Sequence, residues 1–211
     1  MSLQPPLSAA HAAPSPARPA QGADAAALAA TLARAFVDDP FVSHLVPGRD
    51  ARVRKLPGLF GLLFKLGRPY GACDVTDKTE AAALWRPPGA WHIPLRHYLT
   101  NGPLLLGIFG TNTLRALGAM DTLERRHPRE PHWYLQAIGT DPAFQGKGYG
   151  GVLLRHRLAL IDAAGLPAYL EASRESNVPL YANFGFVLTG EVRIADGPTL
   201  YPMWRAPERR K

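Results

Sequence analysis

Residues 145–151 read Gln145-Gly146-Lys147-Gly148-Tyr149-Gly150-Gly151. The run that ends shortly before them, residues 132–140, is rich in aromatic and β-favouring residues and predicts a strand. The run that follows, residues 152–164, has apolar residues near helical spacing and predicts a helix. A glycine-rich turn that opens a helix exposes backbone N–H groups at the positive end of the helix dipole. The stretch therefore predicts a binding site for a phosphorylated ligand.

Several families bind phosphate with such a turn, and residue spacing separates them. A P-loop needs a hydroxyl residue after its lysine, but Lys147 is followed by Gly148. A dinucleotide fingerprint fits the glycines formally, yet it belongs in a first βαβ unit with an acidic residue about 20 positions later. Residues 166–169 occupy that position here, late in the chain, and none of them is acidic. A dinucleotide site is therefore disfavoured, and a turn without a phosphate ligand stays open as an alternative.

The order Q-x-x-G-x-G over residues 145–150 resembles the signature of the GNAT superfamily of N-acetyltransferases. Downstream, residues 177–186 are similar to a second segment of that superfamily, N-x-x-x-Y followed by Gly-Phe. The chain is most similar to the puromycin N-acetyltransferases and their uncharacterised relatives. This resemblance is dense over residues 128–205 and thinner over residues 35–40 and 83–88.

The resemblance implies an α/β (α+β) class and the GNAT fold. In this fold a central mixed, mostly antiparallel sheet splays apart between two parallel strands and is flanked by helices. Hydrophobic spacing agrees, since it predicts helices over residues 24–37 and 52–66 and within 98–120. Residues 72–77 and 81–85 are expected to form a hairpin.

Length and composition indicate a single domain. We expect it to span residues 23–206, between a flexible Ala-, Pro- and Ser-rich N-terminal tail (1–22) and a basic C-terminal tail (207–211). The apolar stretches are too short or too interrupted to cross a bilayer. A lone cysteine, Cys73, gives neither an internal disulfide nor a metal cluster. These features together suggest a cytoplasmic protein without a membrane or metal.

The formal net charge of +7 raises the question of nucleic acid. Lysine and arginine are spread along the chain, and the aromatic-interleaved basic motif of an RNA-binding module is missing from the sequence. We therefore expect a solvated basic surface and no nucleic-acid partner. Positive charge near the glycine-rich turn would also attract the phosphates of coenzyme A.

The resemblance also implies how the donor is bound. Backbone groups of Ile138, Gly139 and Thr140 would contact the pantetheine arm, and the N–H of Ile138 would polarise the thioester carbonyl. The pyrophosphate would be held by the turn and the residues beside it, namely Gln145, Gly146, Lys147, Gly148, Tyr149, Gly150 and Gly151. The ordinary alternative for Lys147 is a solvated side chain.

Two residues are the first candidates for proton transfer. The resemblance places Tyr181 near the sulfur of coenzyme A as a general acid, although an aromatic core residue is the alternative. Asn177 lies one helical turn earlier and would bind the same arm or cap the helix. Glu171, on the strand predicted after the helix, is our first choice of general base. Weaker candidates for the amine side are His132, Tyr134, Asp38 and Asp39.

The predicted function is N-acetylation with acetyl-CoA as co-substrate, by direct attack of a primary amine in a ternary complex. The resemblance suggests a small molecule, of aminonucleoside or antibiotic type. Acetylation of protein N-termini or lysines stays open, as does an acyl-CoA sensor without catalytic activity. A homodimer is also left open.

Overall fold

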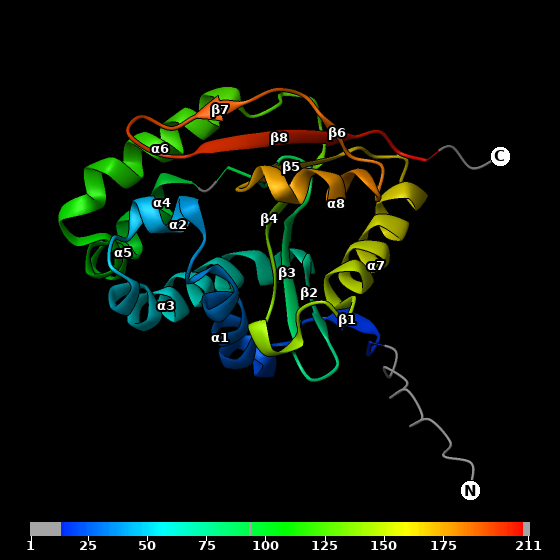
Figure 1. Ribbon diagram of the computed structural model, residues 1–211, viewed down its shortest axis with the longest axis horizontal. Coiled ribbons are helices and arrows are strands. Elements are labelled where there is room, and N and C mark those ends of the chain that lie inside the picture. The colour runs from blue at the N-terminus through cyan, green and yellow to red at the C-terminus, as the bar shows by residue number, and fades with distance from the viewer. Residues whose placement is uncertain (1–13, 93, 209–211) are drawn as a thin grey trace, which may run out of the picture.

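The computed structural model describes residues 14–92 and 94–208, and these residues form one mixed sheet with helices on both faces (Figure 1). The strand order is β1-β2-β3-β4-β5-β8-β6, with β7 attached to β8. β4 and β5 are parallel, whereas the other strand pairs are antiparallel. The strands are β1 (Ala17–Pro19), β2 (Cys73–Thr76), β3 (Ala81–Arg86), β4 (Trp133–Thr140), β5 (Ala168–Ala172), β6 (Val187–Leu188), β7 (Val192–Arg193) and β8 (Thr199–Arg205). This architecture confirms the predicted fold.

The helices lie on both faces of the sheet, and those that the hydrophobic spacing predicts occur in the expected order along the sequence. They are α1 (Ala25–Phe36), α2 (Pro40–Leu45), α3 (Arg49–Gly67), α4 (Leu95–Thr100), α5 (Gly102–Phe109), α6 (Thr113–Arg126), α7 (Tyr149–Ala163) and α8 (Val178–Ala182). In the described residues, none of them is long and apolar enough to cross a membrane.

Alternation along β3 divides the core between the two faces of the sheet. Ala81, Ala83 and Trp85 pack with α7, whereas Ala82 and Leu84 pack with α1 and α3. Successive side chains of a strand point to opposite faces, and every residue of β3 is buried. β3 is therefore a central strand that joins the two layers (Figure 1).

The sheet opens between its two parallel strands. β4 and β5 pair only as far as Leu135 and Leu170, after which β5 continues along β8. On its other side, β4 carries one extra residue, Gln136, because Leu84 faces Ala137 while Trp85 faces Leu135. Such a bulge bends the strand that carries it. β4 therefore departs from β5 at this point and leaves a gap that no strand of the described chain fills.

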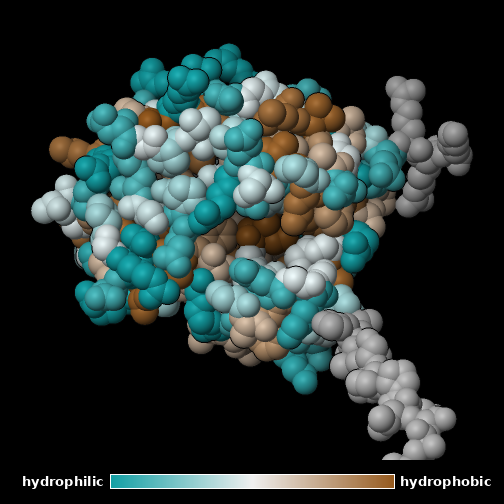
Figure 2. All heavy atoms as spheres, viewed as in Figure 1, coloured by the Kyte–Doolittle hydropathy of each residue, from teal (hydrophilic) through white to brown (hydrophobic). Residues whose placement is uncertain are grey.

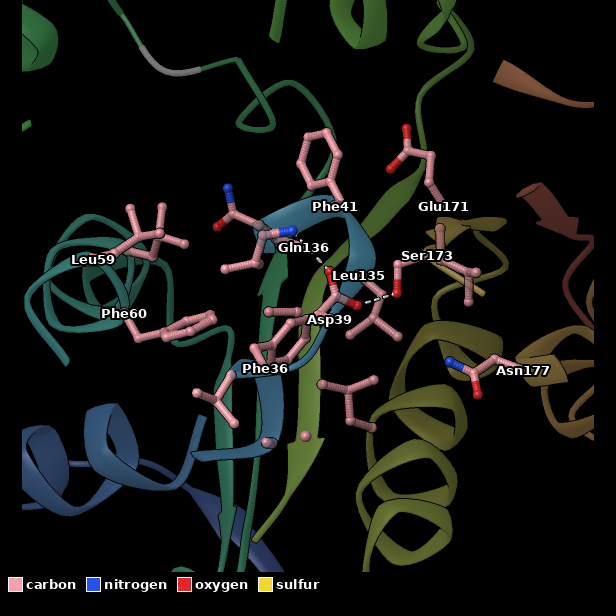
Figure 3. Close-up of a pocket in the computed structure, with 18 of the residues that line it drawn as sticks. Phe36, Asp39, Phe41, Leu59, Phe60, Leu135, Gln136, Glu171, Ser173 and Asn177 are labelled. Atoms are coloured by element: carbon pink, nitrogen blue, oxygen red, sulfur yellow. Dashed lines mark hydrogen bonds between the residues drawn. The ribbon is translucent and has the colours of Figure 1, made fainter. Parts of the chain in front are cut away.

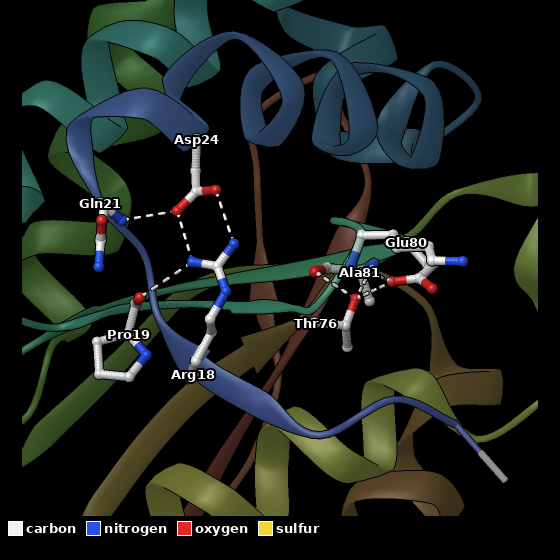
Figure 4. Close-up of polar contacts among 8 residues, drawn as sticks. Arg18, Pro19, Gln21, Asp24, Thr76, Glu80 and Ala81 are labelled. Carbon is white, nitrogen blue, oxygen red and sulfur yellow. Dashed lines mark hydrogen bonds and ion pairs between the residues drawn. The ribbon is translucent and has the colours of Figure 1, made fainter.

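The N-terminal segment differs from the predicted flexible tail. β1 pairs with β2, Ala20 N–H donates to the Cys73 carbonyl at 2.8 Å, and Arg18 pairs with Asp24 at 2.7 Å (Figure 4). These contacts order residues 17–24 because they satisfy the free edge of β2. Residues 1–13 of the predicted tail lie outside the described residues.

Close packing at Gly139 provides a test of the α1–β4 interface. A Cβ on this residue would lie 2.6 Å from Ala35 Cβ and 3.2 Å from Leu32 Cδ2. Gly139→Ala should therefore push α1 away from the sheet and destabilise the protein by about 1–3 kcal/mol in urea unfolding. Gly118→Ala in α6 is the control, because nothing lies within 4 Å of that Cβ, and it should be neutral or stabilise by roughly 0.5–1 kcal/mol. Equal stability of both variants would contradict the packing.

Candidate active site

A cavity of about 1420 Å³ runs through the opening of the sheet. It begins at the glycine-rich turn, passes between β4 and β5, and ends among α2, α3, α5 and α6. Figure 3 shows its middle part, between Leu135 and Gln136 on one side and Glu171 and Asn177 on the other. Figure 2 shows the hollow with apolar side chains at its floor. All of the predicted donor and catalytic residues except Lys147 thus line one continuous space.

At one end of the cavity, the glycine-rich turn precedes α7. Gly146 has φ 76° and Gly148 has φ 84°, and Gly148 is the N-cap of α7. Both angles are in the left-handed region that favours glycine. Within the described chain, no protein group accepts a hydrogen bond from the N–H groups of residues 146–151. These donors converge at a helix N-terminus, which is the geometry of an anion site.

Two side chains of the turn bind backbone carbonyls of the same segment. Gln145 Nε2 donates to Thr140 O at 3.2 Å, and Lys147 Nζ donates to Ala143 O at 3.4 Å. Both side chains are exposed. They flank the free N–H groups without covering them.

Backbone direction along β4 decides which amides face the gap. Asp141 N–H donates to Glu80 O at 2.9 Å, so that amide points towards β3. Because direction alternates along a strand, the N–H of Gly139 also points to β3, and those of Ile138 and Thr140 point into the gap. The donors predicted at Ile138 and Thr140 therefore face the cavity. Gly139 instead packs its Cα side against α1.

Tyr181 and Asn177 lie together on the far wall of the gap. Both line the cavity from α8, and Asn177 is the N-cap residue, without a capping hydrogen bond from its side chain. The Tyr181 ring packs on Phe186 with the ring centres 6.2 Å apart. Burial, and then the negative charge of Asp39, raises the pKa of the Tyr181 hydroxyl to about 12. Its proton is therefore retained at neutral and moderately alkaline pH.

Asp39 connects the α1–α2 turn with the strand across the gap. Its Oδ1 accepts from Val42 N–H at 3.0 Å and caps α2, and its Oδ2 accepts from the Ser173 hydroxyl (Figure 3). Asp39 is buried, whereas neighbouring Asp38 is exposed and lies 3.4 Å from Arg49. Both carboxylate oxygens of Asp39 are thus occupied by structural contacts.

Glu171 is the first residue of β5 beyond the last β4–β5 pair, and it lines the cavity. Its side chain is only 6% exposed. The carboxylate lies near the hydroxyls of Tyr134 and Tyr169. Burial, and then the Glu171 charge, raises the pKa of each hydroxyl. His127 Nδ1 lies 3.7 Å from Glu171 Oε1.

The structure brings together residues that the sequence separates. Tyr134 and His132, which the sequence marks as weaker candidates, lie in the same cluster as Glu171. His127 and Tyr169 belong to this cluster although the sequence analysis did not include them. Ser173, whose hydroxyl donates to Asp39, was also missed by the sequence analysis.

Comparison with known proteins decides the family. Residues 76–186 match the Acetyltransferase (GNAT) family. The chain belongs to this family.

Relatives of the GNAT chain cover most of its length. A crystal structure described as histone acetyltransferase HPA2 and related acetyltransferase, from Corynebacterium glutamicum, is 30% identical, with a TM-score of 0.71, and the match covers 94% of this chain and 99% of that one. An uncharacterised N-acetyltransferase of Schizosaccharomyces pombe is 29% identical over 85% of this chain and 78% of its own. A polyamine N-acetyltransferase of Drosophila melanogaster is 16% identical, with a TM-score of 0.56 over 90% of this chain and 98% of that one, and shares the fold. The protein is therefore an acetyltransferase, and its family uses acetyl-CoA.

The glycine-rich turn generates a prediction for acetyl-CoA. Gly148→Val should raise the Kd for acetyl-CoA at least about 10-fold, because a β-branched residue does not adopt φ 84° and the turn must change. Isothermal titration calorimetry measures this change. Gly165→Val is a matched control, since its φ is 66° in open space after α7, far along the chain from the turn. Equal affinities of the two variants would contradict a role for the turn.

Proposed function

We propose that this enzyme transfers the acetyl group of acetyl-CoA to the primary amine of a small molecule with an apolar body. The observation that carries this proposal is the continuity of the cavity, which joins the glycine-rich turn, the β4–β5 gap and an apolar chamber. Donor and acceptor can therefore occupy it at the same time, which supports direct attack in a ternary complex.

On the donor side, backbone groups do most of the binding. The N–H groups of residues 146–151 would hold the pyrophosphate, helped by the side chain of Gln145 and the charge of Lys147. Bound acetyl-CoA supplies a thioester, whose carbonyl oxygen gains negative charge when an amine attacks. The N–H of Ile138 would donate to that oxygen, while Thr140 would pair with the arm.

Tyr181 would protonate the departing sulfur. Its hydroxyl keeps its proton because the pKa is raised to about 12. Transfer of that proton to a free thiolate, whose ordinary pKa is near about 8.5, is uphill, so Tyr181 would donate to the sulfur while the C–S bond breaks, and solvent would then reprotonate the tyrosinate. Asn177, one helical turn away, would orient the end of the donor arm.

Glu171 is the better placed of the two buried carboxylates for removing the amine proton. Asp39 already accepts hydrogen bonds on both oxygens, and one of these caps α2. The neighbours of Glu171 are two tyrosine hydroxyls and a histidine, groups that can exchange protons with it. Its position in the cavity lining, just beyond the last β4–β5 pair, supports this role.

The far end of the cavity determines the proposed substrate class. Its walls carry large apolar side chains: Phe36, Phe41, Leu59, Phe60, Leu105, Phe109, Met120 and Leu123. The carboxylates of the described lining residues are Asp38, Asp39 and Glu171, against guanidinium groups at Arg34, Arg49, Arg155 and Arg174. A second ammonium group on the substrate would carry a positive charge that few carboxylates of the lining are free to balance. An apolar or aromatic monoamine fits best, and aminonucleosides with an aromatic aminoacyl group belong to the same class.

An amine screen with thiol detection tests the proposed function. We expect kcat/KM for 2-phenylethylamine or puromycin to exceed that for spermidine, an N-terminal peptide and a lysine peptide by at least about 10-fold, because only the former bury an apolar body. A preference for the peptides would instead show a protein acetyltransferase. Binding of acetyl-CoA without acetylation of any amine would show a sensor.

Replacement of Tyr181 separates binding from chemistry. Tyr181→Phe should lower kcat by about 10²- to 10⁴-fold and leave the Kd for acetyl-CoA unchanged, because the ring remains and the proton donor is lost. Tyr201→Phe on β8 is the control, since Tyr201 packs on the core and does not line the cavity. If Tyr181→Phe retains full kcat while chemistry limits the rate, another group protonates the sulfur.

A further inference from the structure

A series of polar contacts leads from Glu171, which lines the cavity, to His127, His132 and the Glu130 carbonyl. His127 Nδ1 lies 3.7 Å from Glu171 Oε1, the Nε2 atoms of His127 and His132 are 3.0 Å apart, and His132 Nδ1 is 2.5 Å from the Glu130 carbonyl. His127 is the residue after α6, and His132 directly precedes β4. His127 and His132 are 8% and 1% exposed as whole residues, and neither lines the cavity.

The Glu130 carbonyl, at the end of this series of contacts, determines which ring nitrogen of each histidine carries a proton. The Glu130 carbonyl can only accept, so His132 Nδ1 carries a hydrogen. Burial lowers the pKa of His132, which leaves its Nε2 as an acceptor. His127 must then donate through Nε2, and when neutral it presents a lone pair on Nδ1 towards Glu171. Nδ1 of neutral His127 can therefore accept one proton from the Glu171 carboxyl group.

Aromatic rings enclose this proton position. Trp91 stacks on His127 with the ring centres 3.8 Å apart, and Tyr134 and Tyr169 meet its edges at 4.8 and 5.0 Å. The titratable groups that face His127 are Glu171 and Tyr169 of β5, Tyr134 of β4 and His132; the His92–Glu124 pair lies beyond Trp91. Among the described residues that face His127, Glu171 and Tyr134 line the cavity, and Glu171 carries the carboxylate through which a proton held here would exchange.

The proposed reaction produces more protons than one carboxylate can hold. An alkylamine arrives as an ammonium ion, which loses one proton before it can attack and a second one as the amide forms. Glu171 alone accepts one of these. A second acceptor behind it would restore the carboxylate between the two transfers.

We propose that His127 is this second acceptor and acts through Glu171, an inference that rests on the function proposed above. The ammonium N–H passes its proton to Glu171 Oε1, and from there the proton moves to His127 Nδ1, which leaves an imidazolium beside a carboxylate. The neutral amine forms the C–N bond, and the C–S bond breaks. Glu171 takes the second amine proton, and Tyr181 protonates the sulfur. When the products leave, solvent removes two protons and returns one to Tyr181, so that one proton is released overall.

The test compares two amines of nearly equal shape. One is the best apolar amine of the screen, and the other is its β,β-difluoro derivative, whose weakly basic nitrogen arrives neutral at pH 8.5 and has one proton to lose. His127→Gln keeps a donor towards His132 and removes the acceptor that faces Glu171. It should lower kcat/KM at least about 10-fold for the parent amine and less than about 2-fold for the difluoro amine. Glu171→Gln should slow both amines, and His92→Gln, beside Trp91, should slow neither.

Each other outcome has a distinct meaning. Equal losses for both amines in His127→Gln would reduce His127 to a structural role and overturn the proposal. Ring ¹⁵N shifts of the wild-type protein test the proton positions without any turnover: His127 should carry its proton on Nε2 and none on Nδ1 at pH 8.5. A proton on Nδ1 in neutral His127 would also overturn the proposal. If no amine is acetylated by the wild type, the proposed function fails, whereas the ¹⁵N result still decides the state of the histidine pair.

Discussion

The end of pairing between β4 and β5 is the constraint on which the site depends. The extra residue Gln136 bends β4, and the buried Arg86 holds it there, donating to Gln136 Oε1 at 3.0 Å and to Leu63 O at 3.1 Å. A buried guanidinium without partners would be costly, so these contacts also fix Arg86 itself. If β4 stayed paired with β5, the amides of Ile138 and Thr140 would be used within the sheet. The end of β4–β5 pairing therefore opens the cavity and leaves those two amides free to face it.

Contacts across the opening keep its two walls together. Asp39 in the α1–α2 turn accepts from Ser173 after β5, and Arg174 donates to the Asp38 carbonyl. The hydrogen bond from Ser173 to the Asp39 carboxylate is partly buried and contributes roughly 1.5–3 kcal/mol, whereas the Arg174 contact is exposed to solvent. They cross near Tyr181, whose pKa responds to the Asp39 charge. The position of the proposed proton donor therefore depends on a bridge whose partners lie 134 residues apart in sequence.

Local sequence patterns predicted the parts of the site whose geometry is local. The turn at residues 145–151 and the helix after it follow from glycine chemistry and helical periodicity, whereas Asn177 and Tyr181 were identified by the resemblance to the GNAT superfamily. The bulge at Gln136, by contrast, depends on register with β3, which no local pattern encodes. β1 was missed because its pairing is entirely with β2 and its sequence, Ala-Arg-Pro, has little strand preference. The contact of His127 with Glu171 joins the end of α6 to β5, and it became visible only when the fold placed them together.

The two ends of the cavity are built from different kinds of group, and this difference has a consequence for specificity. The donor end uses backbone N–H groups, which remain wherever the turn and the open strand are kept, whatever the side chains around them. The proposed acceptor end is lined by side chains from α1, α2, α3, α5 and α6. A chain that shares only 16% identity with this one has the same fold. In the proposed function, the amine is recognised by helices that the family signature at residues 145–150 does not include, so the apolar lining is a better guide to the amine than the signature itself.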